Sequence, residues 1–131
     1  MSDFAPCMEE KVWGQVLHLF TSKHSSISLL EVDKDSWCSI HKHKDRVNHF
    51  IVIEGLIEIL GFGESDEPST HPLESTLLGP GNSLTVPAKV WHQFVVKESG
   101  RMIEVYWPSE PGKRVWSTDI ERRTLGGKID A

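Results

Sequence analysis

The stretch HKHKDRVNHFIVIEGLIEILGF, residues 41–62, carries the main signal for the fold. It contains two largely apolar, β-branched runs, HFIVIE and LIEILGF, which meet at Gly55. Valine, isoleucine and phenylalanine are enriched in strands, and glycine readily adopts the positive φ that a tight reversal between two strands requires. The pattern therefore predicts two β-strands joined by a tight turn at Gly55.

Strand-like segments continue on both sides of this stretch. Before it, KVWGQVLHLF, SISLLEV and SWCSIHKH follow one another, with a turn signal at residues 33–35. After it, a polar loop over residues 63–74 precedes STLLG, SLTVP, WHQFVV and RMIEVYW, which GPGN and KESG punctuate as turns. Many short strands with glycine and proline turns, and no helical period, are typical of an all-β sandwich or barrel.

Length and composition indicate one globular domain. The chain has 131 residues, 38% of them hydrophobic and 25% charged. We expect a flexible N-terminus over residues 1–10, one folded domain over 11–127 and a C-terminal tail over 128–131. The formal net charge of −5 argues against a nucleic-acid partner. No apolar run approaches the ~18 residues of a membrane span, and the amino terminus lacks the apolar core of a secretory signal, so we expect a cytoplasmic protein with no membrane partner.

Three histidines have a spacing that composition does not explain. His41 and His43 are two residues apart in a predicted strand, so both side chains leave the same face and can share one cation. The full pattern is His41-x-His43-x4-Asn48-x6-Gly55, followed by a second block that has a glycine, a proline and His92 at the spacing Gly-x5-Pro-x4-His. The pair His41 and His43 is compatible with a shared metal ion.

The two blocks, in this order, resemble the paired motifs of the cupin superfamily, whose members are small jelly-roll β-barrels. The resemblance implies a single-domain cupin fold in which His41, His43 and His92 bind one metal ion inside the barrel. The family's glutamate ligand corresponds to Asn48, so an amide stands where the charged fourth ligand is expected. The alternative is a cupin-shaped barrel whose histidines bind no ion and hydrogen-bond one another.

Shorter matches narrow the resemblance to the cupin domain of type II mannose-6-phosphate isomerases. Residues 12–14 (VWG) resemble the opening Pro-Trp-Gly of that family, and residues 46–50 (RVNHF) resemble its Arg-Ala-Glu-His-Trp. Residues 103–105 (IEV) and 119–122 (DIER) resemble two later segments. The resemblance implies a metal-dependent isomerase of a small polar substrate, with a sugar or sugar phosphate favoured.

Candidate catalytic residues lie near the end of the chain. If the KESG turn forms a hairpin that pairs Phe94 with Glu104, then Glu104 faces the same side as His92 and is a candidate general base or fourth ligand. The alternative for Glu104 is a solvent-facing position on an edge strand. Tyr106 shares its face and is a candidate hydrogen-bond donor to substrate. Arg122, or Arg46, is the candidate for holding a phosphate.

The cofactor expected is one divalent ion per chain, with zinc, manganese, nickel and iron left open. Three histidines without a carboxylate also suit Fe(II), so a dioxygenase of a small molecule is the second hypothesis. A third is a barrel that binds a metal or ligand without turnover. Tryptophans are many for a small domain, among them Trp13, Trp91, Trp107 and Trp116. Trp91 neighbours His92 and is expected to face outward if His92 faces inward, and an outward aromatic side chain on a β-shell predicts a homodimer.

Overall fold

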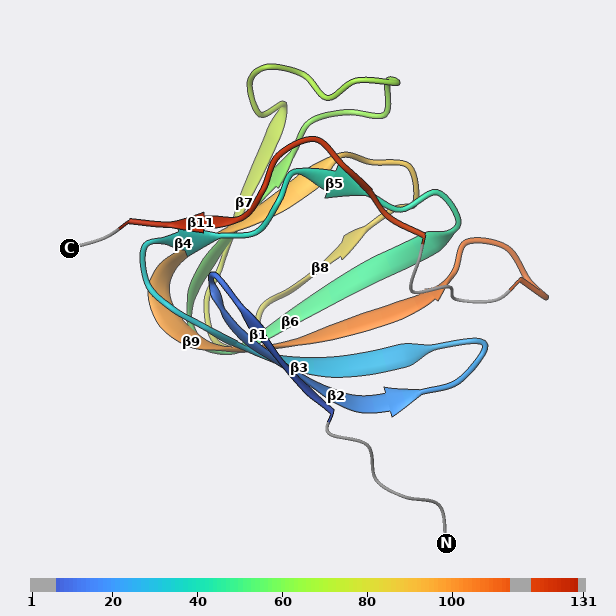
Figure 1. The fold of residues 1–131 in the computed structure, drawn as a ribbon. Helices are drawn as coiled ribbons and strands as arrows, with labels where there is room; N and C mark the ends of the chain where they lie inside the picture. The colour runs from blue at the N-terminus through green and yellow to red at the C-terminus, as the bar shows by residue number, and fades with distance from the viewer. Residues whose placement is uncertain (1–6, 114–118, 130–131) are drawn as a thin grey trace, which may run out of the picture.

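Within the described residues, 7–113 and 119–129, the computed structural model contains β-strands and no helix (Figure 1). The strands, in chain order, are β1 (Met8–Lys11), β2 (Gly14–Thr21), β3 (Ser26–Val32), β4 (Ser36–Trp37), β5 (His41–Lys42), β6 (Arg46–Gly61), β7 (Glu74–Leu78), β8 (Ser83–Val86), β9 (His92–Pro108), β10 (Glu121–Arg122) and β11 (Gly127–Lys128). The all-β prediction is confirmed. The predicted domain boundaries fall at β1 and β11, and the flexible ends stay a prediction, since residues 1–6 and 130–131 lie outside the described part.

The two long strands, β6 and β9, form the frame of the barrel. They pair antiparallel along their whole lengths, from Arg46 opposite Pro108 to Gly61 opposite His92. One half of the barrel is ordered β1-β2-β3-β9-β6-β8, and the other is ordered β11-β4-β9-β6-β7. Because both strands curve from one half into the other, the sheet closes around a common interior (Figure 1).

Gly55 and Gly100 allow this curvature, which corrects two predictions made from sequence. Gly55 has φ +91° but lies inside β6, where irregular pairing with β9 bends the strand. A side chain at Gly100 would overlap the carbonyl oxygen of Glu54. The predicted turn at Gly55 and the predicted KESG hairpin are therefore wrong, because the two glycines let β6 and β9 approach closely and bend together instead of reversing.

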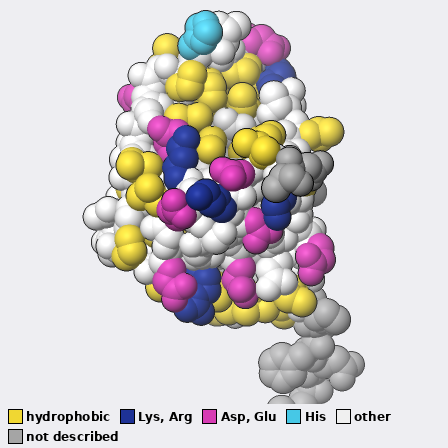
Figure 2. Space-filling model, turned by 90° about the vertical axis from the view of Figure 1, so that its left-hand side faces the viewer, with side chains coloured by type: hydrophobic (Ala, Val, Ile, Leu, Met, Phe, Trp, Pro, Cys, Tyr) yellow, Lys and Arg dark blue, Asp and Glu magenta, His cyan; other side chains and the backbone are white. Residues whose placement is uncertain are grey.

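The core lies between the two halves of the barrel. Buried apolar side chains from nearly every long strand contact one another there, among them Leu30, Phe50, Ile57, Phe94 and Met102. On the outer face shown in Figure 2, basic and acidic side chains are interspersed with hydrophobic ones. No helix in the described part of the chain is long and apolar enough to cross a membrane.

Trp91 lies outside the barrel interior, as predicted, but it is fully buried and therefore not exposed to a partner. Its indole Nε1 donates a hydrogen bond to the carbonyl oxygen of Ser65 at 2.7 Å, from the loop that follows β6. The side chains of Lys42 and Arg123 cover its ring at 4.7 and 4.8 Å from the centroid. An indole on the outside of the barrel is thus covered by the chain's own loop and cations. The homodimer stays a prediction without Trp91 as its interface, and Trp116 lies outside the described residues.

Candidate metal centre and its cavity

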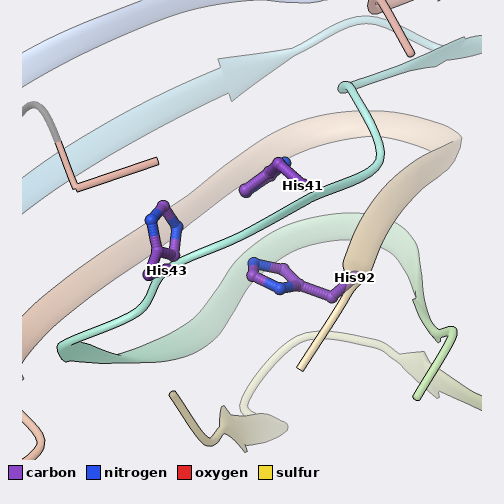
Figure 3. A group of neighbouring side chains, drawn as sticks. All are labelled: His41, His43 and His92. Atoms are coloured by element: carbon purple, nitrogen blue, oxygen red, sulfur yellow. The ribbon is translucent and has the colours of Figure 1, made fainter. Parts of the chain in front are cut away.

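The three predicted histidines converge in the barrel interior. His41 lies on β5 and pairs in register with His92, the first residue of β9, while His43 follows one residue after β5. One ring nitrogen of each histidine lies within 4.8 Å of those of the other two, and Figure 3 shows the three side chains close together. All three side chains are buried. The sequence spacing therefore brings together the residues it singled out.

Each of the three imidazole rings is held in place by a hydrogen bond at its Nδ1 atom. Nδ1 of His41 lies 2.8 Å from the carbonyl oxygen of Ser39, and Nδ1 of His92 lies 2.9 Å from that of Val90. Nδ1 of His43 lies 2.7 Å from the carbonyl oxygen of Asp119. A carbonyl oxygen only accepts, so each Nδ1 carries the proton and each Nε2 keeps a free lone pair. This tautomer is the one that presents Nε2 to a metal ion.

Asp119 is a supporting residue to which the sequence analysis gave no role. Its carboxylate accepts hydrogen bonds from the backbone N–H groups of Lys44 and Asp45, both at 2.8 Å. These bonds fix the segment before β10 against the turn that follows His43, so that the Asp119 carbonyl oxygen reaches the His43 ring. A contact between residues 76 apart has no signal in local sequence.

Burial keeps the three rings neutral. Loss of hydration lowers the pKa of His43 to about 2 and that of His92 to about 4, and nearby Arg46 adds to both shifts. The pKa of His41 is lowered well below its usual range by burial and by the other two rings. Metal binding needs the deprotonated imidazole, so the site holds its ligands in the binding form at neutral and mildly acidic pH.

The residues fit a transition-metal ion. Nε2 of His43 and Oδ1 of Asn48 are buried and have no hydrogen-bond partner among the described residues. Buried polar atoms are rarely left without a partner, and an ion among the three Nε2 atoms would provide one for His43. Imidazole nitrogen suits zinc, iron, nickel and copper. No carboxylate of the described residues belongs to this cluster.

Asn48 lies beside the cluster and contacts the predicted catalytic residues. Its Nδ2 is 3.5 Å from Nε2 of His92, and it donates a hydrogen bond of 3.1 Å to Oε2 of Glu104. The hydroxyl of Tyr106 lies 3.4 Å from the same Nδ2. The amide at the family's glutamate position therefore connects His92 to a carboxylate on the neighbouring strand.

Glu104 faces the interior, although the predicted reason for this was wrong. It pairs in register with Phe50 on β6 and Ser28 on β3, not with Phe94. Burial raises the pKa of the Glu104 carboxyl, while hydrogen bonds from Tyr106 and Asn48 oppose the rise. Burial also raises the pKa of Tyr106 well above its usual range. Burial therefore favours the protonated form of both groups.

A cavity of about 480 Å³ opens beside the histidine cluster, with His41 in its wall. The wall also includes Glu104 and Tyr106, together with Arg46 and Arg122. Its remaining lining includes hydroxyl and apolar side chains, among them Ser26, Ser28, Ser39, Trp13 and Leu30, and the charged side chains of Glu9 and Lys11. The volume is that of a small-molecule site.

His18 lines the same cavity, although the sequence analysis gave it no role. Its Nδ1 lies 3.2 Å from Oγ of Ser28, and its Nε2 lies 3.0 Å from a carboxylate oxygen of Glu9. The pairing of β2 with β3 brings His18 opposite Ser28. Only this strand register reveals the contact, since no ligand spacing in the sequence marks His18.

Comparisons with known proteins support this fold. No model of a protein family matches the sequence, and neither does any curated protein. Among solved structures, KdgF from Halomonas sp. matches with a TM-score of 0.60 and 17% identity, over 84% of this chain and 86% of its own. An RmlC-like cupin from Shewanella frigidimarina matches with a TM-score of 0.60 and 19% identity, over 83% of both chains. Pac13, described as a nucleoside dehydratase, matches with a TM-score of 0.68 and 11% identity, over 90% of this chain and 84% of its own.

At these identities the likeness concerns the fold alone. The described residues form a single-domain cupin jelly-roll, and the predicted fold class is confirmed. The resemblance to type II mannose-6-phosphate isomerases stays a prediction.

Proposed function

We propose that the protein is a metal-dependent cupin enzyme that transfers a proton between adjacent carbons of a small polar substrate, with a sugar or sugar phosphate as the favoured class. The observation that carries this proposal is a cluster of three buried histidines, one of which, His41, lines the same cavity as the Glu104 carboxyl. When bound, a divalent ion supplies a Lewis acid that polarises a substrate carbonyl.

The chain's own residues have separate tasks in this reaction. Glu104 removes the proton from one carbon and returns it to the next, and its raised pKa favours the return step. Asn48 fixes one carboxyl oxygen of Glu104 through its Nδ2, which aims the group into the cavity. Tyr106 donates a hydrogen bond to a substrate oxygen. Arg122, at the rim on β10, is placed to bind an anionic group distant from the reacting carbons.

Solvent exchange tests the proposal. Metal-supplemented protein in D2O is incubated with mannose 6-phosphate or fructose 6-phosphate, and deuterium at C2 of the aldose phosphate and at C1 of the ketose phosphate is followed by NMR. We expect exchange that Glu104→Gln slows at least about a hundredfold, because removing a general base typically costs that much. Glu58→Gln, on the outer surface, is the matched control and should exchange normally. No exchange across a panel of aldose and ketose phosphates would contradict the isomerase assignment.

A three-histidine Fe(II) dioxygenase is the second candidate. The observation that favours it is the absence of a carboxylate from the histidine cluster in the described residues. The iron-loaded protein would then consume oxygen in the presence of a small organic substrate. Oxygen consumption without exchange at C2 or C1 would replace the first proposal with this one, and neither activity would favour a binding protein without turnover.

A further inference from the structure

We infer that Arg46 is the anion-binding residue of the cavity, and that its ligand is a small polyhydroxylated carboxylate whose charged group lies next to the three histidines. This inference rests on the proposed function, because it names the substrate class of the same site. The cavity then has two positions for a negatively charged group of a ligand, a deep one at Arg46 and one at the rim at Arg122.

The first observation is a buried cation that forms no ion pair. Arg46 is only 8% exposed and lines the cavity, yet within the described residues no carboxylate forms an ion pair with it. Arg101 and Arg123, by contrast, each pair with glutamate. A buried charge is costly unless it is paired, so Arg46 is placed for a partner that the described chain does not provide.

The second observation is what the guanidinium does contact. It lies 4.0 Å over the centre of the Tyr106 ring, and its Nε lies 3.1 Å from Nδ1 of His43. The proton on Nδ1 of His43 is directed to the Asp119 carbonyl oxygen, so this ring nitrogen provides no negative charge to Arg46. Among the described residues, no hydrogen bond is formed by the two terminal guanidinium nitrogens of Arg46. Neither nitrogen belongs to the fully buried polar atoms that lack a partner. These two donors remain free for a bidentate bond with an oxyanion.

The third observation is the charge around the site. Arg46 lies within electrostatic reach of Glu104, whose carboxylate already accepts a hydrogen bond from Asn48. A divalent ion held by the three histidines would add positive charge beside Arg46. An anion at this position would offset both charges.

The position of Arg46 selects a carboxylate next to the reacting carbons. Because Nε of Arg46 contacts the His43 ring and His41 lines the same cavity as Arg46, a carboxylate bound by Arg46 would have its neighbouring carbons near the histidine cluster. A phosphate at the far end of a six-carbon sugar lies several bonds away and would reach Arg122 instead. The hydroxyls of Ser26, Ser28 and Ser39, with the apolar face of Trp13, fit a polyhydroxylated chain.

Calorimetric titration tests this inference with three probes: D-gluconate, its neutral counterpart D-sorbitol, and D-glucose 6-phosphate. Each is titrated into metal-free and Zn(II)-loaded protein. We expect gluconate to bind at least tenfold more tightly than sorbitol, and Arg46→Met to remove that preference in both forms. Arg46→Lys, which keeps the charge but loses the planar fork, should bind gluconate with intermediate affinity. Arg101→Met, on the outer surface, should have no effect.

Several outcomes would overturn the inference. The first is that gluconate binds no more tightly than sorbitol. The second is that a folded Arg46→Met protein binds gluconate with unchanged affinity. The third is that glucose 6-phosphate binds more tightly than gluconate and that Arg46→Met abolishes its binding. Circular dichroism and Zn(II) affinity check that each variant is folded, and Arg46→Lys carries the test if the methionine variant is not. Gluconate binding by the metal-free protein does not depend on turnover, so failure of the solvent-exchange assay would remain distinguishable from failure of this inference.

Discussion

Lowering the pH of the metal-free protein from 7 to 5 tests how deeply His43 is buried. The unfolded chain takes up a proton on this imidazole near pH 6.5, whereas burial lowers the folded-state pKa to about 2. Below pH 6.5 the unfolded state therefore binds more protons, so the free energy of unfolding falls as the pH falls. Each pH unit costs about 1.4 kcal/mol per histidine, which amounts to about 2 kcal/mol for His43 between pH 6.5 and 5.

His92 acts in the same direction over this window, because its folded-state pKa is about 4. The raised pKa of Glu104 acts in the opposite direction, because there the folded state holds the extra proton. A single substitution isolates the contribution of His43. Asparagine at position 43 keeps a donor near the Nδ1 position for the Asp119 carbonyl oxygen but does not titrate.

Urea unfolding at several pH values, with EDTA present, measures the effect. The wild-type protein should lose about 2 kcal/mol more than His43→Asn between pH 7 and pH 5. His24→Asn, at an exposed position, is the control and should follow the wild type. Parallel pH profiles for wild type and His43→Asn would refute the assignment of His43 as a buried neutral ring.

Three further predictions concern individual positions. Asn48→Glu should tighten Mn(II) or Zn(II) binding at least tenfold, because a carboxylate replaces a neutral amide beside His92. Equal or weaker affinity of the variant in a metal titration would place residue 48 away from the ion. Gly100→Ala should lower the free energy of unfolding by about 1–3 kcal/mol, because the added Cβ would meet the Glu54 carbonyl oxygen. Gly79→Ala is the control and should be nearly neutral, because its Cβ would meet only the Asn82 side chain at 3.7 Å. Equal urea midpoints for the two variants would contradict the close approach of β6 and β9. Trp91→Ala should cost about 3–5 kcal/mol in urea unfolding, and a loss no larger than that of half-exposed Trp107→Ala would show that the loop does not cover the indole.

The histidine cluster could be predicted from sequence because its geometry is local to two strands. Two residues apart on an extended segment, His41 and His43 must point the same way, and the second block brings in His92. The roles of Asp119 and His18 could not be predicted in this way. Their contacts depend on which strands become neighbours and in which register, and nothing in the local pattern encodes that.

Glu104 and Gly55 show a different limit. Glu104 was correctly expected to face inward, but from a hairpin that does not form; alternation along β9 leads to the same side because Glu104 is two residues beyond the buried Met102. A glycine with positive φ between two apolar runs fits both a turn and a bend, and Gly55 is the bend. The choice depends on its partner Gly100, 45 positions away, whose missing side chain leaves room for the approach.

The metal content of the purified protein tests the central claim most directly. Wild type and a His41→Ala/His43→Ala double variant are purified identically, their metals are measured by mass spectrometry, and circular dichroism checks that the β fold persists. Exposed His24 and His71, replaced together by alanine, provide the matched control. We predict stoichiometric transition metal in wild type and control, and none in the folded double variant. Equal metal content in all three proteins, or a wild-type protein that takes up no transition metal when it is supplied, would contradict the assignment of His41, His43 and His92 as a metal centre.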